Sequence, residues 1–252
     1  MLEIKNLSKV YDDGTKALNN VSFTVPDGEF LVVIGLSGSG KSTLLRCINR
    51  LIEPTSGQII LNGQDITAAS PAQLRLMRRD IGMIFQQFNL VKRSSVMKNV
   101  LAGRLGYVNP WLSMLGIFPK EERERARRAL ETVGITEKAN NRADALSGGQ
   151  QQRVGIARAL MQEPKLLLAD EPVSALDPAT SHSVMKYIEQ INRDQGVSVI
   201  CSLHFLSLAR TYASRIIALK DGDMMFDGGP KEIDEARFKE IYGEEAVEVE
   251  IN

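Results

Sequence analysis

Compact apolar runs alternate along this sequence with segments whose apolar residues recur at helical spacing. Three runs have the length and composition of strands buried on both faces: FLVVIG (30–35), KLLLADEP (165–172) and GVSVICSLH (196–204). A helix is predicted directly after the first run, at KSTLLRCINRL (41–51). Strands that alternate with helices predict an α/β fold with a mainly parallel sheet and crossover helices.

Other segments predict an antiparallel β subdomain and further helices around that sheet. The first thirty residues have the pattern of short strands and turns, and GQIILNGQDI (57–66) has the character of a hairpin. Residues 92–118 fit no single pattern. The remaining expected elements are helices at 71–79 and 120–134, a strand over 80–87, a strand and hairpin over 215–229, and a loosely held acidic tail, EEAVEVEIN (244–252).

Composition narrows the class of protein without identifying it. Hydrophobic residues make up 43% of the 252 residues and charged residues 25%, which is typical of a globular protein with a core. Lys and Arg number 31, as do Asp and Glu, and a zero net charge argues against a nucleic-acid partner. Cys47 and Cys201 lack metal-site spacing, so a reduced cytoplasmic protein is expected. There is no signal-peptide pattern at the N-terminus and no run of apolar residues long enough to span a membrane.

The first candidate for chemistry is GLSGSGKS (Gly35–Ser42), which matches the P-loop pattern GxxxxGK[ST] in full between a predicted strand and a predicted helix. Backbone N–H groups and the helix dipole of such a loop bind phosphates. Lys41 is expected to reach the β- and γ-phosphates, and Ser42 to ligate Mg²⁺. The motif predicts binding of ATP or GTP, but kinases, GTPases and motors share it.

The second candidate is LLLADE (166–171), an apolar strand that ends in two acids. Asp170 emerges at the carboxyl end of the strand, where open α/β sheets bind ligands, and it can hold Mg²⁺ through water. Glu171 can polarise an attacking water, which favours hydrolysis over transfer of a phosphoryl group to another substrate.

The third candidate is LSGGQQQRVGIARAL (146–160), whose Ser147 and Gln150 form a capping-box pattern at the start of a helix. Gly148 and Gly149 occupy the first turn, where each glycine costs about 1 kcal/mol relative to alanine. A capped helix that begins with glycines can bring its N-terminus close to an anion, whereas a simple helix cap explains the serine and glutamine but not the glycines.

In their order, these motifs resemble the nucleotide-binding subunit of an ABC transporter. The resemblance rests on Gly35–Ser42, Gln86, LSGGQ at 146–150, LLLADE at 166–171, the segment SALD at 174–177 and His204. It implies a single P-loop ATPase domain over 1–252. Its expected parts are a nucleotide-binding core with an antiparallel β subdomain over about 1–86 and 160–235, an inserted helical subdomain over about 87–159, and a C-terminal tail over 236–252.

In that family two ATPase domains meet head to tail, and each ATP lies between the P-loop of one copy and the LSGGQ motif of the other. The resemblance therefore implies an ATP-dependent homodimer in which Asp177 bridges the two copies. It also implies that the nucleotide of one copy is contacted by four residues of the other: Ser147, Gly148, Gly149 and Gln150.

The resemblance assigns roles to further residues around ATP and Mg²⁺. Tyr11 is implied to stack on adenine, His204 to contact the γ-phosphate, and Gln86 to sense Mg²⁺ and the attacking water, with Gln87 as the alternative. The implied catalytic residues are Glu171, His204 and Gln86, and the implied Mg²⁺ ligands are Ser42, Gln86 and Asp170. The implied phosphate contacts are Gly35, Ser37, Gly38, Ser39, Gly40, Lys41, Ser42 and Thr43.

The family also implies partners: two integral membrane permease subunits and, indirectly, a periplasmic or extracellular solute-binding protein, on the cytoplasmic face of the plasma membrane. The segments GRLGYVNPWLSMLGIF (103–118) and RFKEIYG (237–243) resemble the ATPase subunits of bacterial phosphonate importers. The apolar stripe around Trp111 fits either the core of the helical subdomain or a docking surface for a permease.

Three alternatives are open to different degrees. A soluble ABC ATPase acting on nucleic acid or ribosomes is disfavoured by the zero net charge and the single cassette. A P-loop kinase would have no use for LSGGQ in trans, and Glu171 favours water as the acceptor of the phosphoryl group. A transporter for another solute, such as an amino acid or phosphite, or an exporter, is compatible with every motif.

Overall fold

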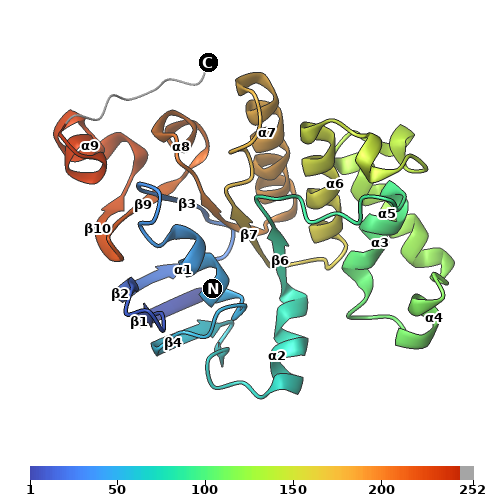
Figure 1. The fold of residues 1–252 in the computed structure, drawn as a ribbon, viewed down its shortest axis with the longest axis horizontal. Coiled ribbons are helices and arrows are strands. Elements are labelled where there is room, and N and C mark those ends of the chain that lie inside the picture. The colour runs from blue at the N-terminus through green and yellow to red at the C-terminus, as the bar shows by residue number, and fades with distance from the viewer. Residues whose placement is uncertain (245–252) are drawn as a thin grey trace.

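The computed structural model describes residues 1–244, which form two sheets with helices around them (Figure 1). The smaller sheet has the strand order β2-β1-β4-β5 and is antiparallel throughout. Its strands are β1 (Leu2–Val10), β2 (Lys16–Val25), β4 (Ser56–Leu61) and β5 (Gln64–Asp65). The antiparallel β subdomain expected from the sequence is therefore present.

The larger sheet has the strand order β10-β9-β3-β8-β7-β6, and every neighbouring pair except β10 and β9 is parallel. Its strands are β3 (Phe30–Ile34), β6 (Ile81–Ile84), β7 (Leu166–Asp170), β8 (Ser198–Ser202), β9 (Arg215–Lys220) and β10 (Asp223–Gly228). This sheet confirms the predicted α/β fold and the three predicted buried strands.

The continuous apolar runs of these strands arise because both faces of the sheet are covered. Along β3, Leu31 and Val33 belong to one core cluster, shared with the antiparallel sheet and α1 (Lys41–Ile48). Val32 and Ile34 belong to the other cluster, which is shared with the helices on the opposite face. Successive side chains of a strand point to opposite faces, so a strand between two cores is apolar along most of its length.

The helical region is inserted between β6 and β7 and lies at one end of the molecule (Figure 1). It contains α3 (Val96–Leu101), α4 (Pro110–Met114), α5 (Lys120–Thr132) and α6 (Gly148–Leu160). Residues 92–118, which fitted no single pattern, thus contain two short helices. Pro110 and Pro119 stand at the starts of α4 and α5, where proline costs no backbone hydrogen bond.

The remaining helices are α2 (Pro71–Met77), α7 (Pro178–Gln195), α8 (Leu206–Tyr212) and α9 (Glu235–Tyr242). Four expected elements were too long. The helix α1 ends at Ile48, α2 passes into a 3₁₀ turn at Arg78, β6 ends at Ile84 before the glutamines, and α5 ends at Thr132. The boundary expected at residue 236 lies inside α9, whose Phe238 and Ile241 are buried. The acidic tail is outside the described residues except for its first member. Within residues 1–244, no helix is both long and apolar enough to cross a bilayer.

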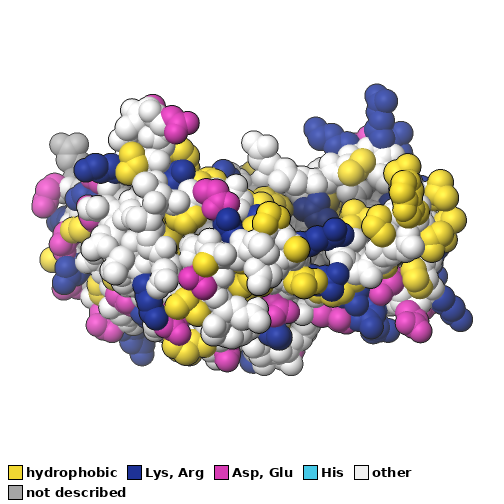
Figure 2. Space-filling view, turned by 90° about the horizontal axis from the view of Figure 1, so that it is seen from below, with side chains coloured by type: hydrophobic (Ala, Val, Ile, Leu, Met, Phe, Trp, Pro, Cys, Tyr) yellow, Lys and Arg dark blue, Asp and Glu magenta, His cyan; other side chains and the backbone are white. Residues whose placement is uncertain are grey.

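The apolar stripe around Trp111 lies on the surface, so the core alternative is wrong for most of it. Figure 2 shows hydrophobic side chains gathered at one end of the molecule (right). Trp111 is 77% exposed and Met114 79% exposed, and their neighbours Leu112, Leu115 and Ile117 are exposed as well. Only Phe118 packs against the main core.

Candidate functional site

The P-loop leaves the carboxyl end of β3 and leads into α1, as the motif predicts. The loop packs against the backbones of β9 and β2, and two of its glycines allow this close contact. A Cβ on Gly35 (φ +141°) would lie 2.1 Å from the carbonyl oxygen of Leu219 in β9. A Cβ on Gly40 (φ +104°), the N-cap of α1, would lie 2.2 Å from the carbonyl oxygen of Ala17 in β2. No other residue fits at these two positions.

Lys41 is folded back into the loop. Its Nζ donates to the carbonyl oxygens of Gly35 at 2.8 Å and Leu36 at 2.9 Å. Burial lowers the pKa of Lys41, and the negative charges of Glu171 and Asp170 oppose that shift. The buried Ser39 hydroxyl has no hydrogen-bond partner within residues 1–244. The loop thus holds a buried ammonium and an unpaired hydroxyl, two groups that a phosphate can engage.

Asp170 at the end of β7 is buried and accepts three hydrogen bonds. The Ser42 hydroxyl donates to its Oδ1 at 2.6 Å, the Ser202 hydroxyl to Oδ1 at 3.3 Å, and Arg46 to Oδ2 at 3.1 Å. Sequence reasoning paired Ser42 with Asp170 and missed the other two. Arg46 lies four residues after Ser42 on α1, hence on the same helix face. Ser202 is directly opposite Asp170 in the parallel register of β8 and β7.

Glu171 and His204 face each other across the carboxyl ends of β7 and β8. Glu171 Oε1 lies 2.6 Å from His204 Nε2, and the glutamate side chain is only 11% exposed. The backbone of Glu171 has φ +48°, a left-handed conformation that is costly for a residue with a Cβ. Its N–H donates to Ser202 Oγ at 2.9 Å and its carbonyl accepts from Ser174 Oγ at 3.1 Å, so the neighbours hold this conformation.

One cavity of about 670 Å³ gathers most of the residues singled out by sequence. Gln86 lines it and Gln87 does not, which favours Gln86 of the two glutamines. Tyr11 lies at the wall, with its hydroxyl 3.2 Å from Thr43 Oγ1. Sequence reasoning missed two lining residues, Thr15 and Ala17, and gave no role to a third, Ser174 of the SALD segment. The predicted residues that line the cavity are Tyr11, Ser37, Gly38, Gly40, Lys41, Ser42, Thr43, Gln86, Glu171 and His204.

The LSGGQ motif opens α6 with the capping box that the sequence predicts. Gln150 N–H donates to Ser147 Oγ, and the Gln150 amide oxygen accepts from Ser147 N–H at 3.1 Å. None of residues 147–150 lines the P-loop cavity. A Cβ on Gly149 would lie 2.3 Å from Thr180 Cγ2, whereas a Cβ on Gly148 would meet Leu176 Cδ2 at 3.3 Å. Packing within one chain therefore explains Gly149 but not Gly148.

Asp177, the last residue of the SALD segment, is the N-cap of α7, the helix against which Gly149 packs. Its Oδ1 accepts from Thr180 N–H at 3.0 Å, and the hydrogen bonds with Thr180 lower the pKa of the carboxyl. Asp177 is exposed and does not line the cavity. Residues 147–150 and Asp177 thus form a second group of predicted site residues outside the P-loop cavity.

The segment after Gln86 is hydrogen-bonded to the C-terminal turn of α6. Arg158 donates to the carbonyl oxygens of Asn89 at 2.5 Å and Phe88 at 2.9 Å, both residues with positive φ. The Phe88 ring reaches back to Gly148, where a Cβ would lie 3.8 Å from its Cζ. The chain that leaves the cavity at Gln86 therefore contacts α6 at its first and its last turn.

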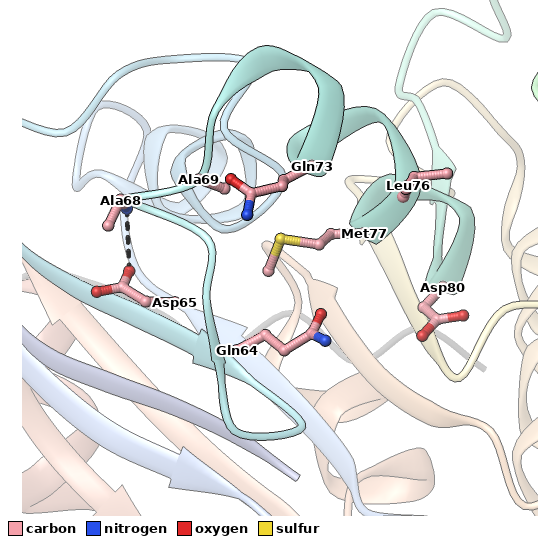
Figure 3. Close-up of a pocket in the computed structure, with 8 residues that line it drawn as sticks. All are labelled: Gln64, Asp65, Ala68, Ala69, Gln73, Leu76, Met77 and Asp80. Atoms are coloured by element: carbon pink, nitrogen blue, oxygen red, sulfur yellow. Dashed lines mark hydrogen bonds between the residues drawn. The ribbon is translucent and has the colours of Figure 1, made fainter.

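A further cavity of about 490 Å³ lies between β5 and α2 and contains none of the predicted site residues (Figure 3). Its two carboxylates are engaged elsewhere. Asp65 accepts hydrogen bonds from the backbone of Thr67 at 2.8 Å and Ala68 at 3.2 Å, and Asp80 pairs with Lys165 at 3.0 Å. In the part of the chain that the structure describes, no lysine lines this cavity, and neither of its carboxylates faces a histidine as Glu171 does.

Comparison with known proteins agrees with this geometry. The family model described as ABC transporter matches residues 18–174. The phosphonates import ATP-binding protein PhnC of Bdellovibrio bacteriovorus is 58% identical, over 100% of this chain and 97% of that protein. The protein of the same name from Bacillus anthracis is 57% identical, over 97% and 95%.

Solved structures give the same result. The dimeric ATP-binding cassette MJ0796 bound to ADP and Pi is 37% identical and has a TM-score of 0.81, over 91% of this chain and 99% of that one. The cbiO1 subunit from Clostridium perfringens, part of the ABC transporter complex cbiONQ, is 30% identical with a TM-score of 0.82, over 95% and 92%. The chain belongs to the ABC transporter family, as an ATP-binding cassette.

Proposed function

We propose that this ATPase powers an importer for phosphonate or a related phosphorus oxyanion, and that it works as a homodimer that closes on two ATP molecules. The observation that carries the proposal is the division of the predicted residues into two groups. Ten of them line one cavity, and Gly35, Ser39 and Asp170 lie beside that lining, in the P-loop or in contact with Ser42. Residues 147–150 and Asp177 lie outside the cavity. A second copy placed head to tail would bring the outer group to the open side of the cavity.

Mg²⁺ is proposed to bind at Ser42, Asp170 and Gln86. Within residues 1–244, no cluster of three or more His, Cys, Asp or Glu side chains could hold a metal on its own. That suits Mg²⁺, which keeps several waters and is commonly held by one or two protein groups together with substrate phosphates. The 2.6 Å contact between Ser42 Oγ and Asp170 Oδ1 already brings a hydroxyl and a carboxylate together. When Mg²⁺ is bound there, it would supply positive charge that offsets the negative charge developing on the phosphate groups.

Glu171 is proposed as the base that orients the attacking water, with His204 holding the γ-phosphate. Their 2.6 Å contact places a carboxylate oxygen and an imidazole nitrogen at the same end of the cavity. Lys41 would exchange its two carbonyl acceptors in the loop for the β- and γ-phosphates. Tyr11, expected to stack on adenine, and Thr43, expected to contact phosphate, both line the cavity.

The LSGGQ motif is proposed to close the cavity of the other copy. In each copy Ser147 and the first-turn N–H groups of α6 would donate to the γ-phosphate, with the helix dipole adding favourable charge. Gly148, whose Cβ would meet only flexible side chains in its own chain, would allow this approach.

A groove of about 510 Å³ is the proposed docking place for a permease subunit. It lies between the core and the helical region, and Phe85 and Arg158 connect its wall to the segment around Gln86. The exposed apolar side chains of α4 follow directly after Tyr107, another residue of the groove. Two permease subunits, and through them a solute-binding protein, would hold the dimer at the cytoplasmic face of the membrane.

The cargo is proposed from the relatives, because this subunit does not touch the transported solute. The relatives named as phosphonates import proteins match along almost the whole chain, including the segments 103–118 and 237–243. The test is ATPase stimulation in vesicles that contain this chain, phosphonate permease subunits and their binding protein. Methylphosphonate is expected to stimulate hydrolysis, while an amino acid is not. Stimulation by phosphite alone would replace phosphonate by that related oxyanion as the cargo, and stimulation by amino acids would contradict the proposed class of cargo.

The dimer is tested with two variants. Glu171→Gln is expected to trap an ATP-bound dimer, because ATP still joins the copies while hydrolysis no longer separates them. Adding Ser147→Arg should return it to a monomer, because a long cation would occupy the approach to the phosphate. Light scattering with MgATP measures both. A monomeric Glu171→Gln variant, also in the presence of the permease subunits, would contradict the trans-site proposal.

A further inference from the structure

The C-terminal segment 230–242 wraps around the elements that carry the proposed phosphate-contacting histidine. Phe238 and Ile241 of α9 are buried in the main core, together with Leu206 and Ala209 of α8. Arg210 near the end of α8 donates to the carbonyl oxygen of Ile233 at 2.7 Å. The segment is therefore part of the fold and is anchored on α8.

The last turn of α9 touches the site at His204. The Tyr242 hydroxyl donates to the carbonyl oxygen of His204 at 3.4 Å. The Tyr242 ring is fixed against Phe238, with 4.8 Å between the ring centroids. The Tyr242 hydroxyl therefore binds the backbone of His204, and the imidazole of His204 contacts Glu171 at 2.6 Å.

A second contact joins α9 to β9, the strand that lies against the P-loop. Lys220, the last residue of β9, donates to the carbonyl oxygen of Glu240 at 2.7 Å. The preceding residue, Leu219, is the one whose carbonyl approaches Gly35 of the P-loop. The motif RFKEIYG, which the functional proposal leaves without a role, therefore bridges the strand behind the P-loop and the turn that carries His204.

We propose that α9 is a brace for the catalytic turn and that Tyr242 is a positioning residue for His204. By holding the His204 carbonyl, the Tyr242 hydroxyl keeps the imidazole opposite Glu171 when the γ-phosphate is bound. His204 lies in the middle of the three-residue connection between β8 and α8. Without a contact to its backbone, such a connection is free to change conformation and to turn the imidazole away from Glu171. This inference rests on the proposed role of His204 in hydrolysis.

The test is a kinetic cycle on the full chain with Tyr242→Phe, His204→Ala and the double variant. Tyr242→Phe keeps the ring pair and removes only the hydroxyl. It is expected to lower kcat about fivefold, the value of one hydrogen bond, with KM for ATP changed less than about twofold. In the His204→Ala background the same change should alter kcat by less than about 1.5-fold. The matched control is Tyr187→Phe on α7, away from the cavity, which should leave kcat unchanged.

Equal losses in both backgrounds would overturn the inference, because α9 would then act on the fold and not through His204. Normal kcat for Tyr242→Phe would overturn it too. If His204→Ala itself retains full activity, the proposed role of His204 fails, and histidine NMR then decides about the brace. The chain has two histidines, His182 and His204, so their ring signals can be assigned with one variant. Tyr242→Phe should shift the His204 signal in the MgATP state while Tyr187→Phe does not; an unmoved signal means that there is no brace.

Discussion

The paired glycines of LSGGQ allow packing and function to be separated by experiment. In α6 the two positions differ by one residue and have different surroundings. A Cβ at 149 would lie 2.3 Å from Thr180 Cγ2, a stiff β-branched side chain, while a Cβ at 148 would meet the flexible end of Leu176 at 3.3 Å. We therefore expect Gly149→Ala to destabilise the fold and Gly148→Ala not to.

The expected magnitudes follow from two opposing effects. Replacing a helical glycine by alanine stabilises by up to about 1 kcal/mol. Forcing an extra methyl into a filled space costs about 1–3 kcal/mol. Gly149→Ala should therefore lose about 1 kcal/mol net, and Gly148→Ala should gain up to about 1 kcal/mol. For a domain of this size each kcal/mol moves the melting temperature by about 2–4 °C.

Thermal unfolding of both variants measures the packing effect, and steady-state ATPase measures function. Thr180→Ser removes the crowded methyl, so the double variant Gly149→Ala/Thr180→Ser should recover the melting temperature of Thr180→Ser alone. ATPase is expected to stay low in Gly148→Ala and in the recovered double variant, because each Cβ narrows the approach to the phosphate. Equal melting temperatures for the two single variants would refute the packing account. Full ATPase in stable variants would refute the phosphate account.

Three further variants test single contacts of the site. Lys41→Ala should abolish binding of a fluorescent ATP analogue, because the β- and γ-phosphates lose their cation; unchanged affinity would contradict the P-loop assignment. Ser202→Ala should lower kcat with little change in KM, because Glu171 N–H loses its acceptor at 2.9 Å; a changed KM with normal kcat would speak against it. Arg158→Leu should lower the free energy of unfolding by about 1–3 kcal/mol, since two carbonyls lose their donor. Urea unfolding measures this, and an unchanged midpoint would show that the contacts contribute nothing.

Much of the fold could be predicted because the strands of the large sheet are buried on both sides. Their runs of Leu, Ile and Val carry an unambiguous signal, and the P-loop glycines mark where β3 ends and α1 begins. The capping box at Ser147 likewise fixed the start of α6. These are local features, so one sequence is enough to show them.

Features that depend on contacts between distant segments were missed. Arg46 and Ser202 reach Asp170 from two other elements, and only the order of strands brings Ser202 beside it. The apolar residues around Trp111 have the composition of a core segment, yet they lie outside because α4 is a short helix at the edge of the insertion. The composition of a segment shows how apolar it is, but not whether another element of the protein packs over it.

The short segment from Glu171 to Asp177 connects the two groups of site residues within one chain. Glu171 belongs to the chain's own cavity, while Leu176 lies against Gly148 and Asp177 caps the helix that packs on Gly149. The turn is closed by hydrogen bonds from Ser174 N–H to the carbonyl of Glu171 and from Leu176 N–H to that of Val173. In the proposed dimer, a change at Glu171 on hydrolysis would therefore reach the motif that this chain lends to its partner's ATP. Such a link would make the two sites of the proposed dimer dependent on each other through the seven residues of the turn.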